Sequence, residues 1–477
     1  MKRIFNSIQY LLSPRSWLKL WIGFFILAAF FVTARTTFEY KRYARALYLF
    51  AGDEPKYLRM AQSLAEDNDL DVSNFWGSRE DIARLRERAS AKATRRYGHL
   101  YVFGKNKGIY SLHMPGVAFL IYPGYVLDLL RFPHKSVRTS KNLPFLPDRL
   151  LFTRLSLLVM AAVSLLLLLR LLSSLFPSLL VTAILLLVFV FDSPFCRIGL
   201  QVYPDGPALL FLLLAMNAVW HPFPDKRVND ILFVLSIGFL PWLHQRFIPI
   251  SLAIYLVLII RCRHGGSFFK RLLPISGALF LLSLPYFYYF FSITGNPSPL
   301  SLVRTYGEKF IQLSILPLGF FGQLFSTKAG LLWLHPWALF FLIGIFQGLK
   351  KERRHSLELL LVFFPYYLAC SGAFPWTGAS SPAGRFSVPI LPVYLIFAGF
   401  AADGLLRASS PKKWLFYGLL VSPFLINKVH AFVHLDFGYG RVTAADLGAM
   451  LIVGLYLVIL YGALFLAERK KRSIASV

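Results

Sequence analysis

Long apolar runs separated by short polar turns make up most of the chain. A helix that crosses the hydrocarbon core of a bilayer needs about 17–25 mostly apolar residues. Runs at or near this length lie at 17–34, 150–170, 178–195, 207–221, 230–243, 247–261, 272–292, 331–349, 356–372, 388–406, 412–427 and 446–467. The pattern predicts an all-α polytopic membrane protein, a bundle of about 12 transmembrane helices.

Composition and charge agree with a membrane protein. Hydrophobic residues make up 56% of the 477 residues and charged residues 16%, whereas soluble proteins carry roughly 45–50% and 25%. The net charge of +28 is expected in cytosolic loops beside anionic lipids, so membrane lipids are predicted partners and nucleic acid is not. The cysteines Cys196, Cys262 and Cys370 lie far apart and predict neither a disulfide framework nor a metal site.

The distribution of Lys and Arg predicts the topology. The apolar run 17–34 follows a basic start and exceeds the ~7–15 residues of a signal peptide, so it is expected to be an uncleaved first helix with a cytosolic N-terminus. The short run 115–130 contains two prolines, two glycines and Asp128. If it does not cross, cytosolic segments hold 22 Lys and Arg and the outer loops after residue 190 hold 8; if it crosses, this bias inverts. We therefore expect 115–130 to be a juxtamembrane helix and both termini to be cytosolic.

One large outer segment, 35–148, follows from this topology. The whole chain, 1–477, is then a single transmembrane domain, with no soluble domain expected at the C-terminus. Ten of the 23 acidic residues lie between 35 and 115. A carboxylate at bilayer depth costs ~2.5–3.5 kcal/mol, so the outer segment and the outer helix ends are the expected places for chemistry.

A short amphipathic helix is predicted at about 55–66, within "AGDEPKYLRMAQSLAEDNDLDVSNFW". Pro55 suits a first helical turn, and apolar residues recur at a spacing of three or four from Tyr57 onwards. Such a helix lies on the membrane and holds Asp53 and Glu54 at the lipid–water boundary. The alternative is that Asp53 only caps the helix.

Other candidate residues lie at predicted outer turns. His113 precedes the juxtamembrane helix and is a candidate for binding the phosphate of a donor; a structural polar anchor is the alternative role. Asp205, in "YPDGPA", is either a helix cap or a second acid facing Asp53. Arg246, Arg385 and Lys328 are isolated cations suited to phosphate binding; snorkelling at the interface is the alternative, favoured for Arg246.

Several functional classes lack their motifs. The sequence contains no GxxxxGK[ST], HExxH or GxSxG pattern, which argues against a P-loop ATPase, a zinc protease and a serine hydrolase. No pair of interrupted spans repeats across two halves, so a secondary transporter has little support.

The order of three motifs resembles a known family. An outer loop opening with "DEPKYLRMAQSLAEDNDLD", then "YSLHMPG", then "YPDGPA" is similar to the GT-C superfamily of integral-membrane glycosyltransferases. The nearest branch is the dolichyl-phosphate-mannose–protein mannosyltransferase and aminoarabinose-transferase type, including bacterial PMT-like members. The likeness covers 1–220 well and 230–400 only in helix rhythm and in the turns around Arg246 and Arg385. Met114-Pro115-Gly116 replaces the usual double proline.

The resemblance implies a GT-C-type bundle and a polyprenyl-phosphate sugar donor. It implies that Asp53, with Glu54 beside it, is the catalytic base and that the region of His113 and Pro115 helps to build the site. Many relatives carry a soluble outer domain at the C-terminus that binds the acceptor. Because no such domain is expected here, the acceptor is expected to be a lipid-linked glycan or another envelope molecule, lipid or protein. A one-step displacement would invert the anomeric centre. Arg385, Arg246, Lys328 or a divalent cation, Mg²⁺ or Mn²⁺, would stabilise the departing phosphate; beyond such a cation, no cofactor is implied.

Two other functions remain open at this point. A transporter or lipid flippase would use ionisable groups such as Asp192 and Asp403, and an inactive relative would bind donor without turnover. The absence of Asn-x-Ser/Thr sites favours a bacterial inner membrane, with the site facing the periplasm.

Overall fold

The computed structural model describes residues 53–75, 94–96, 99–106, 108–131, 150–191, 194–195, 201–263, 268–301, 312–326, 330–373, 376 and 384–407. The predicted spans 17–34, 412–427 and 446–467 lie outside these residues, as do both chain ends, Asp192 and Lys328.

Each predicted span within the described residues contains a helix. These helices are α6 (Leu151–Leu175), α7 (Leu179–Phe191), α9 (Asp205–Trp220), α10 (Lys226–Leu243), α11 (Ile248–Arg263), α12 (Phe268–Thr294), α16 (Leu339–Lys351), α17 (Arg353–Ser371) and α18 (Leu391–Arg407). Among the described residues, α6, Gln245–Arg263 and α12 are long and apolar enough to cross a membrane, and shorter apolar helices occur at Leu179–Val190, Asp205–Trp220, Leu313–Phe325 and Leu391–Leu405. The all-α, integral-membrane class is confirmed.

Two helical details differ from the predicted pattern. The apolar run 331–349 is broken into α15 (Leu331–Leu334), η4 (Pro336–Ala338) and α16, because Pro336 has no N–H to donate and disfavours helical backbone in the residue before it. An additional apolar helix, α14 (Leu316–Phe325), follows the short turn η3 (Leu313–Ile315).

A small antiparallel sheet, which the sequence analysis did not predict, lies in the segment expected outside the membrane. Its strands are β1 (Thr94–Arg96), β2 (His99–Phe103) and β3 (Ile109–Ser111), in the order β1-β2-β3. Register pairs Thr94 with Tyr101, and Tyr101 with Ser111. The carboxylate of Asp71, just before η1 (Val72–Phe75), accepts a hydrogen bond from Ile109 N at 2.8 Å, so the sheet is tied to the end of the preceding helical segment.

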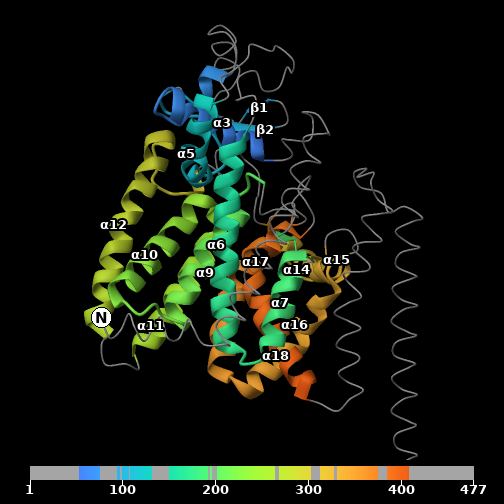
Figure 1. Ribbon diagram of the computed structural model, residues 1–477. Coiled ribbons are helices and arrows are strands. Elements are labelled where there is room, and N and C mark those ends of the chain that lie inside the picture. Colours follow the sequence, from blue (N-terminus) through green and yellow to red (C-terminus); the bar gives the residue numbers. More distant parts are fainter. Residues whose placement is uncertain are drawn as a thin grey trace, which may run out of the picture.

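Helix α3 (Glu54–Glu66) and helix α5 (Gly116–Arg131) lie with the sheet at one end of the bundle (Figure 1). They fall where the two short outer helices were predicted. The apolar stripe of α3 is buried, as Tyr57 and Leu58 show, but so are polar residues such as Lys56 and Gln62. The first ten residues of α3 are therefore enclosed by protein on all sides, whereas the sequence pattern predicted a helix with one polar face.

Helix α5 is fixed to the start of α6 by a buried carboxylate. Asp128 accepts hydrogen bonds from Phe152 N at 2.8 Å, Thr153 N at 2.8 Å and Thr153 Oγ1 at 2.7 Å. It therefore caps the N-terminus of a neighbouring helix. A Cβ at Gly124 would lie 2.5 Å from Phe152 O, so only glycine allows this close approach of the two backbones.

Replacing this cap should cost stability. We expect Asp128→Ala to lower the free energy of unfolding by about 1–2 kcal/mol, the upper part of the range for helix caps, because Asp128 is fully buried. Thermal unfolding in detergent measures the change. Asp225→Ala is the matched control: Asp225 caps α10 from an exposed position, and its loss should cost less. Equal costs for the two variants would contradict the prediction.

Candidate active site

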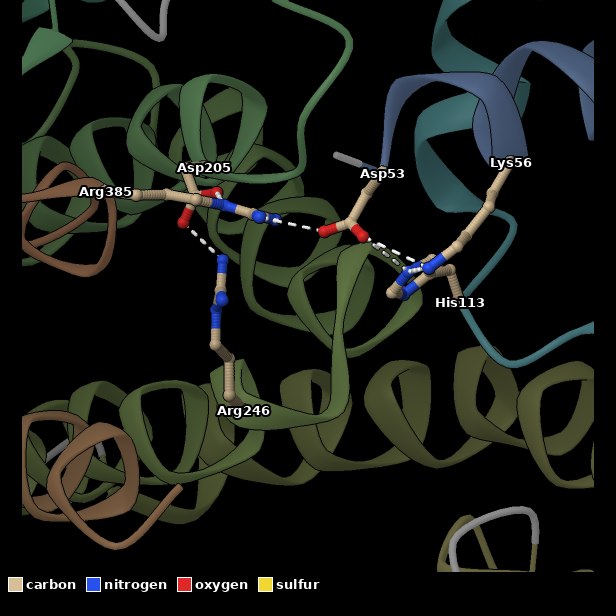
Figure 2. A network of polar contacts seen from close by, with 6 residues as sticks. All are labelled: Asp53, Lys56, His113, Asp205, Arg246 and Arg385. Atoms are coloured by element: carbon tan, nitrogen blue, oxygen red, sulfur yellow. Dashed lines mark hydrogen bonds and ion pairs between the residues drawn. The ribbon is translucent and has the colours of Figure 1, made fainter. Parts of the chain in front are cut away.

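Six charged or imidazole side chains meet at the end of the bundle where α3 and α5 lie (Figure 2). We call this set the charged cluster; it consists of Asp53, Lys56, His113, Asp205, Arg246 and Arg385. The members come from the N-termini of α3 and α9, from the turn between β3 and α5, and from the short 3-10 turns η2 (Gln245–Phe247) and η5 (Arg385–Ser387). Helix ends that are far apart in the sequence thus supply one site.

Arg385 joins the two carboxylates of the cluster. Its Nη1 donates to Asp53 Oδ2 at 2.8 Å and its Nε donates to Asp205 Oδ2 at 2.6 Å. The guanidinium also lies 4.1 Å from the centre of the Tyr203 ring, a favourable cation–π distance. The preceding Gly384 has φ +75°, a conformation that suits glycine and turns Arg385 inwards. Arg385 is buried, so snorkelling does not describe it.

Arg246 is the second cation on Asp205. Its Nη2 donates to Asp205 Oδ1, and its guanidinium lies 4.6 Å from the centre of the Phe386 ring. His244 caps the turn η2, because its Nδ1 accepts a hydrogen bond from Arg246 N at 3.2 Å. With only 11% of its side chain exposed, Arg246 faces the site, and the snorkelling alternative is wrong for this residue as well.

Asp53 does not cap α3, although it precedes that helix, because its side chain makes no capping hydrogen bond. Instead, its Oδ1 lies 3.1 Å from both Lys56 Nζ and His113 Nε2. Burial alone would raise the pKa of this carboxyl, but its interactions with His113, Arg385 and Lys56 outweigh burial and hold the pKa well below its usual range. Asp53 is therefore ionised at neutral pH.

His113 sits between Asp53 and aromatic neighbours. Its ring stacks on Tyr57 with centroids 5.4 Å apart, and it lies 6.3 Å from the His244 ring. Burial, and then the nearby Lys56 ammonium, lower the pKa of His113. The imidazole is consequently neutral at pH 7. A Cβ at Gly116 would lie 2.5 Å from Trp242 O, so this close approach positions the His113 turn against the end of α10.

Glu54 points away from the charged cluster. Its Oε1 accepts hydrogen bonds from Arg154 Nη1 and from Val202 N, both at 2.8 Å. Adjacent helical residues point about 100° apart, which is why Asp53 and Glu54 have different neighbours. Glu54 thus ties the start of α3 to α6 and to the chain segment that leads to Asp205, and we interpret it as a positioning residue.

Loss of the Glu54 charge should destabilise the protein. Removing one partner of a buried ion pair costs roughly 3–5 kcal/mol, and both Glu54 and Arg154 are buried. We expect Glu54→Gln to lower the free energy of unfolding by about 3 kcal/mol, the lower end, because glutamine still accepts from Val202 N. Unfolding in detergent tests this. A double variant Glu54→Leu with Arg154→Met should be less destabilised than the sum of its single variants; simple additivity would argue against a pair.

Lys56 is the member of the cluster that sequence reasoning missed. It lies three residues after Asp53 and so on the same side of the first helical turn. That spacing was the available signal, but the helix at about 55–66 was interpreted only as an amphipathic helix that holds Asp53 and Glu54 at the membrane surface. The structure brings together Asp53, His113, Asp205, Arg246 and Arg385, as named from the sequence; their roles remain predictions.

The cluster does not fit a divalent cation. In the part of the chain that the structure describes, no three His, Cys, Asp or Glu side chains are grouped as metal ligands. Both oxygens of Asp53 face cationic or imidazole nitrogens, and both oxygens of Asp205 face arginines. Mg²⁺ and Mn²⁺ prefer oxygen ligands, and the carboxylate oxygens of this cluster are already engaged by nitrogen donors.

Comparison with known proteins shows a shared fold. No protein-family model matches the chain, and no curated protein matches it. Among solved structures, the chain is similar to ArnT from Cupriavidus metallidurans bound to undecaprenyl phosphate, with a TM-score of 0.54, 14% identity, and coverage of 97% of this chain and 73% of ArnT. Apo ArnT from the same organism gives a TM-score of 0.49 and 14% identity over 92% of this chain and 73% of ArnT. The expected all-helical membrane fold is thereby confirmed as one that this chain shares with ArnT.

Proposed function

We propose that this protein is a membrane glycosyltransferase that moves a sugar from a polyprenyl-phosphate donor to a lipid-linked glycan or another envelope acceptor. The observation that carries the proposal is the ionised Asp53 bonded to the buried Arg385, which shares Asp205 with Arg246, at the end of the bundle. The shared fold supports it, because ArnT is a protein whose structure contains undecaprenyl phosphate.

The charges of the cluster suit a glycosyl phosphate. Lys56, Arg246 and Arg385 supply three positive charges and Asp53 and Asp205 two negative ones, which leaves one positive charge with His113 neutral. A sugar joined to a prenyl phosphate carries one negative charge on its phosphodiester. Binding such a donor would neutralise the buried site, and arginine donors match phosphate oxygens in geometry.

Asp53 is suited to act as the general base. In the proposed reaction its carboxylate takes the proton of an acceptor hydroxyl, the oxygen attacks the anomeric carbon from the side opposite the phosphate, and the carbon–oxygen bond to phosphate breaks. The anomeric centre is inverted. General-base catalysis contributes typically ~10²–10⁴-fold, and Arg385 and Arg246 stabilise the charge on the departing phosphate.

The proposed location follows from where basic helix ends lie. Helix α10 begins at Lys226, and α11 and α16 end at Arg263 and Lys351. The start of α10 and the end of α11 lie at the end of the bundle opposite α3 (Figure 1). Since Lys and Arg favour the cytosolic side, the charged cluster faces outwards. We place the protein in a bacterial inner membrane with its site towards the periplasm and both termini in the cytosol.

The alternative of a transporter finds no specific support among the described residues. Asp403, one of the two acids considered for it, is 2.7 Å from Lys351 Nζ near the ends of α18 and α16. An ion pair at the ends of two helices is expected to be structural, whereas a transported ion or substrate would need ionisable groups deeper in the membrane.

Transfer by the purified protein tests the proposal. The full chain in liposomes would be given undecaprenyl phosphate linked to radiolabelled mannose or aminoarabinose, with envelope lipid extract as acceptor. Label should move to an acceptor, and mass spectrometry of envelope glycans from cells with and without the gene should show the loss of one sugar. Translocation of the donor lipid without transfer of label would overturn the proposal.

A further inference from the structure

Three polar atoms, Asp53 Oδ1, Lys56 Nζ and His113 Nε2, lie at the corners of a small triangle. Lys56 Nζ lies 2.7 Å from His113 Nε2, and both lie 3.1 Å from Asp53 Oδ1. An ammonium group only donates hydrogen bonds. His113 Nε2 is therefore an acceptor, which places the ring hydrogen of the neutral imidazole on Nδ1. Nε2 thus accepts from Lys56 Nζ beside Asp53 Oδ1, and Figure 2 shows the three side chains meeting.

This geometry bears on what happens to a proton after Asp53 has accepted it. Arg385 and Lys56 both lie within hydrogen-bonding distance of the carboxylate, and two adjacent cations make a protonated Asp53 a strong acid. The proton therefore needs a second acceptor. His113 Nε2, at 3.1 Å, is a neutral nitrogen base that touches Asp53.

We propose that His113 relays the proton that Asp53 removes from the acceptor hydroxyl. The O–H bond of the acceptor breaks as an O–H bond forms on Asp53. Lys56 then gives up its hydrogen bond to Nε2 and keeps the one to Asp53, and Asp53 Oδ1–H breaks as an N–H bond forms at His113 Nε2. Asp53 is again a carboxylate and His113 an imidazolium, which later loses a proton to water. The inference rests on the proposed function and adds the fate of the proton to it.

The surroundings of His113 suit this task. Its ring is held by stacking on Tyr57, and its backbone N donates to Ser111 Oγ at 3.1 Å. About one sixth of the side chain, 16%, remains exposed, so the proton has a short way to solvent. Lys56, held in place by both partners, fixes the tautomer and is a positioning residue.

The direction of the pH dependence follows from the groups that face His113. The titratable or charged residues around it are Asp53, Lys56 and Tyr57 on α3, His244 and Arg246 at η2, and Arg385 at η5. Relay requires neutral His113, so activity should fall as the pH drops through the pKa of His113. Without the relay, the acid limb should reflect Asp53, whose pKa lies lower.

The test compares pH profiles of kcat for the wild type and His113→Gln, with undecaprenyl-phosphate mannose or aminoarabinose as donor. We expect kcat to fall about 10- to 100-fold, at or below the lower limit of what a general base contributes because Asp53 is still present, and the acid limb to move to lower pH. His221→Gln, beyond the far end of α9, is the control and should change neither quantity. A lower kcat with an unmoved acid limb would mean that His113 only packs the site.

Nitrogen-15 NMR of protein with labelled histidines tests the tautomer of His113 in the absence of sugar transfer. Near pH 7.5 the His113 signals should show hydrogen on Nδ1 and none on Nε2, and Lys56→Met should change this tautomer. Hydrogen on Nε2 in the wild type would overturn the relay. If the wild type transfers sugar but fails these tests, only the relay falls; if it transfers no sugar from any donor, the proposed function falls and the relay with it.

Discussion

Asp53→Asn should reduce sugar transfer by about 10²–10⁴-fold, the usual contribution of a general base, without preventing membrane insertion. Asparagine keeps the shape of the side chain and can still accept a hydrogen bond from Arg385 or Lys56, but its amide does not take a proton from a hydroxyl. The affinity for the donor should change less than kcat, since Asp53 acts on the acceptor. Initial rates at saturating donor in liposomes provide the measurement.

A matched control separates the loss of a base from the loss of an ion pair. Asp230 accepts a hydrogen bond from Arg271 at 2.6 Å near the start of α10, away from the charged cluster, and it is partly exposed. Asp230→Asn should leave kcat within twofold of the wild type, because exposed pairs contribute little. Full transfer activity in Asp53→Asn would show that another group is the base.

Asp205→Ala should lower the free energy of unfolding by about 5 kcal/mol, the upper end of the range for removing one partner of a buried ion pair. Asp205 is fully buried and holds Arg385 and Arg246 at once, so the substitution leaves two buried guanidinium groups without their shared anion. Thermal or chemical unfolding in detergent measures this cost. Transfer should also fall, because Arg385 loses the partner that orients it beside Asp53.

A second substitution makes this prediction specific. In the double variant Asp205→Ala with Arg246→Met, one of the stranded cations is replaced by an apolar side chain of similar length. The double variant should be more stable than Asp205→Ala alone, since burying an unpaired charge costs more than burying a methionine. If Arg246→Met instead adds further destabilisation, the Asp205–Arg246 pair does not carry the effect.

The spans could be predicted from the sequence because their signal is local and long. The small sheet could not, because strands of three to five residues such as Ile109–Ser111 carry little periodic signal and depend on pairing between separate segments. The interruption at Pro336 was visible in the sequence, but the surrounding apolar run was interpreted as a continuous span.

The site was predictable in its members and less so in its pairings. Asp53, Asp205 and Arg385 were recognisable because charges are scarce in an apolar chain and these lie at predicted outer turns. Their contacts join residues 180 and 332 positions apart, which no local pattern contains. Grouping Glu54 with Asp53 as a catalytic pair followed from their adjacency in sequence, whereas on a helix adjacent side chains diverge.

The bridge made by Arg385 also has a consequence for how the protein is made. Asp53 leaves the ribosome 332 residues before its arginine partner. At roughly 5–20 residues per second, about 15–70 s of synthesis separate the two. Early in this interval Lys56 and His113 can already contact Oδ1 of Asp53, whereas Oδ2 stays hydrated until Arg385 is made, so one of the last described turns completes the site.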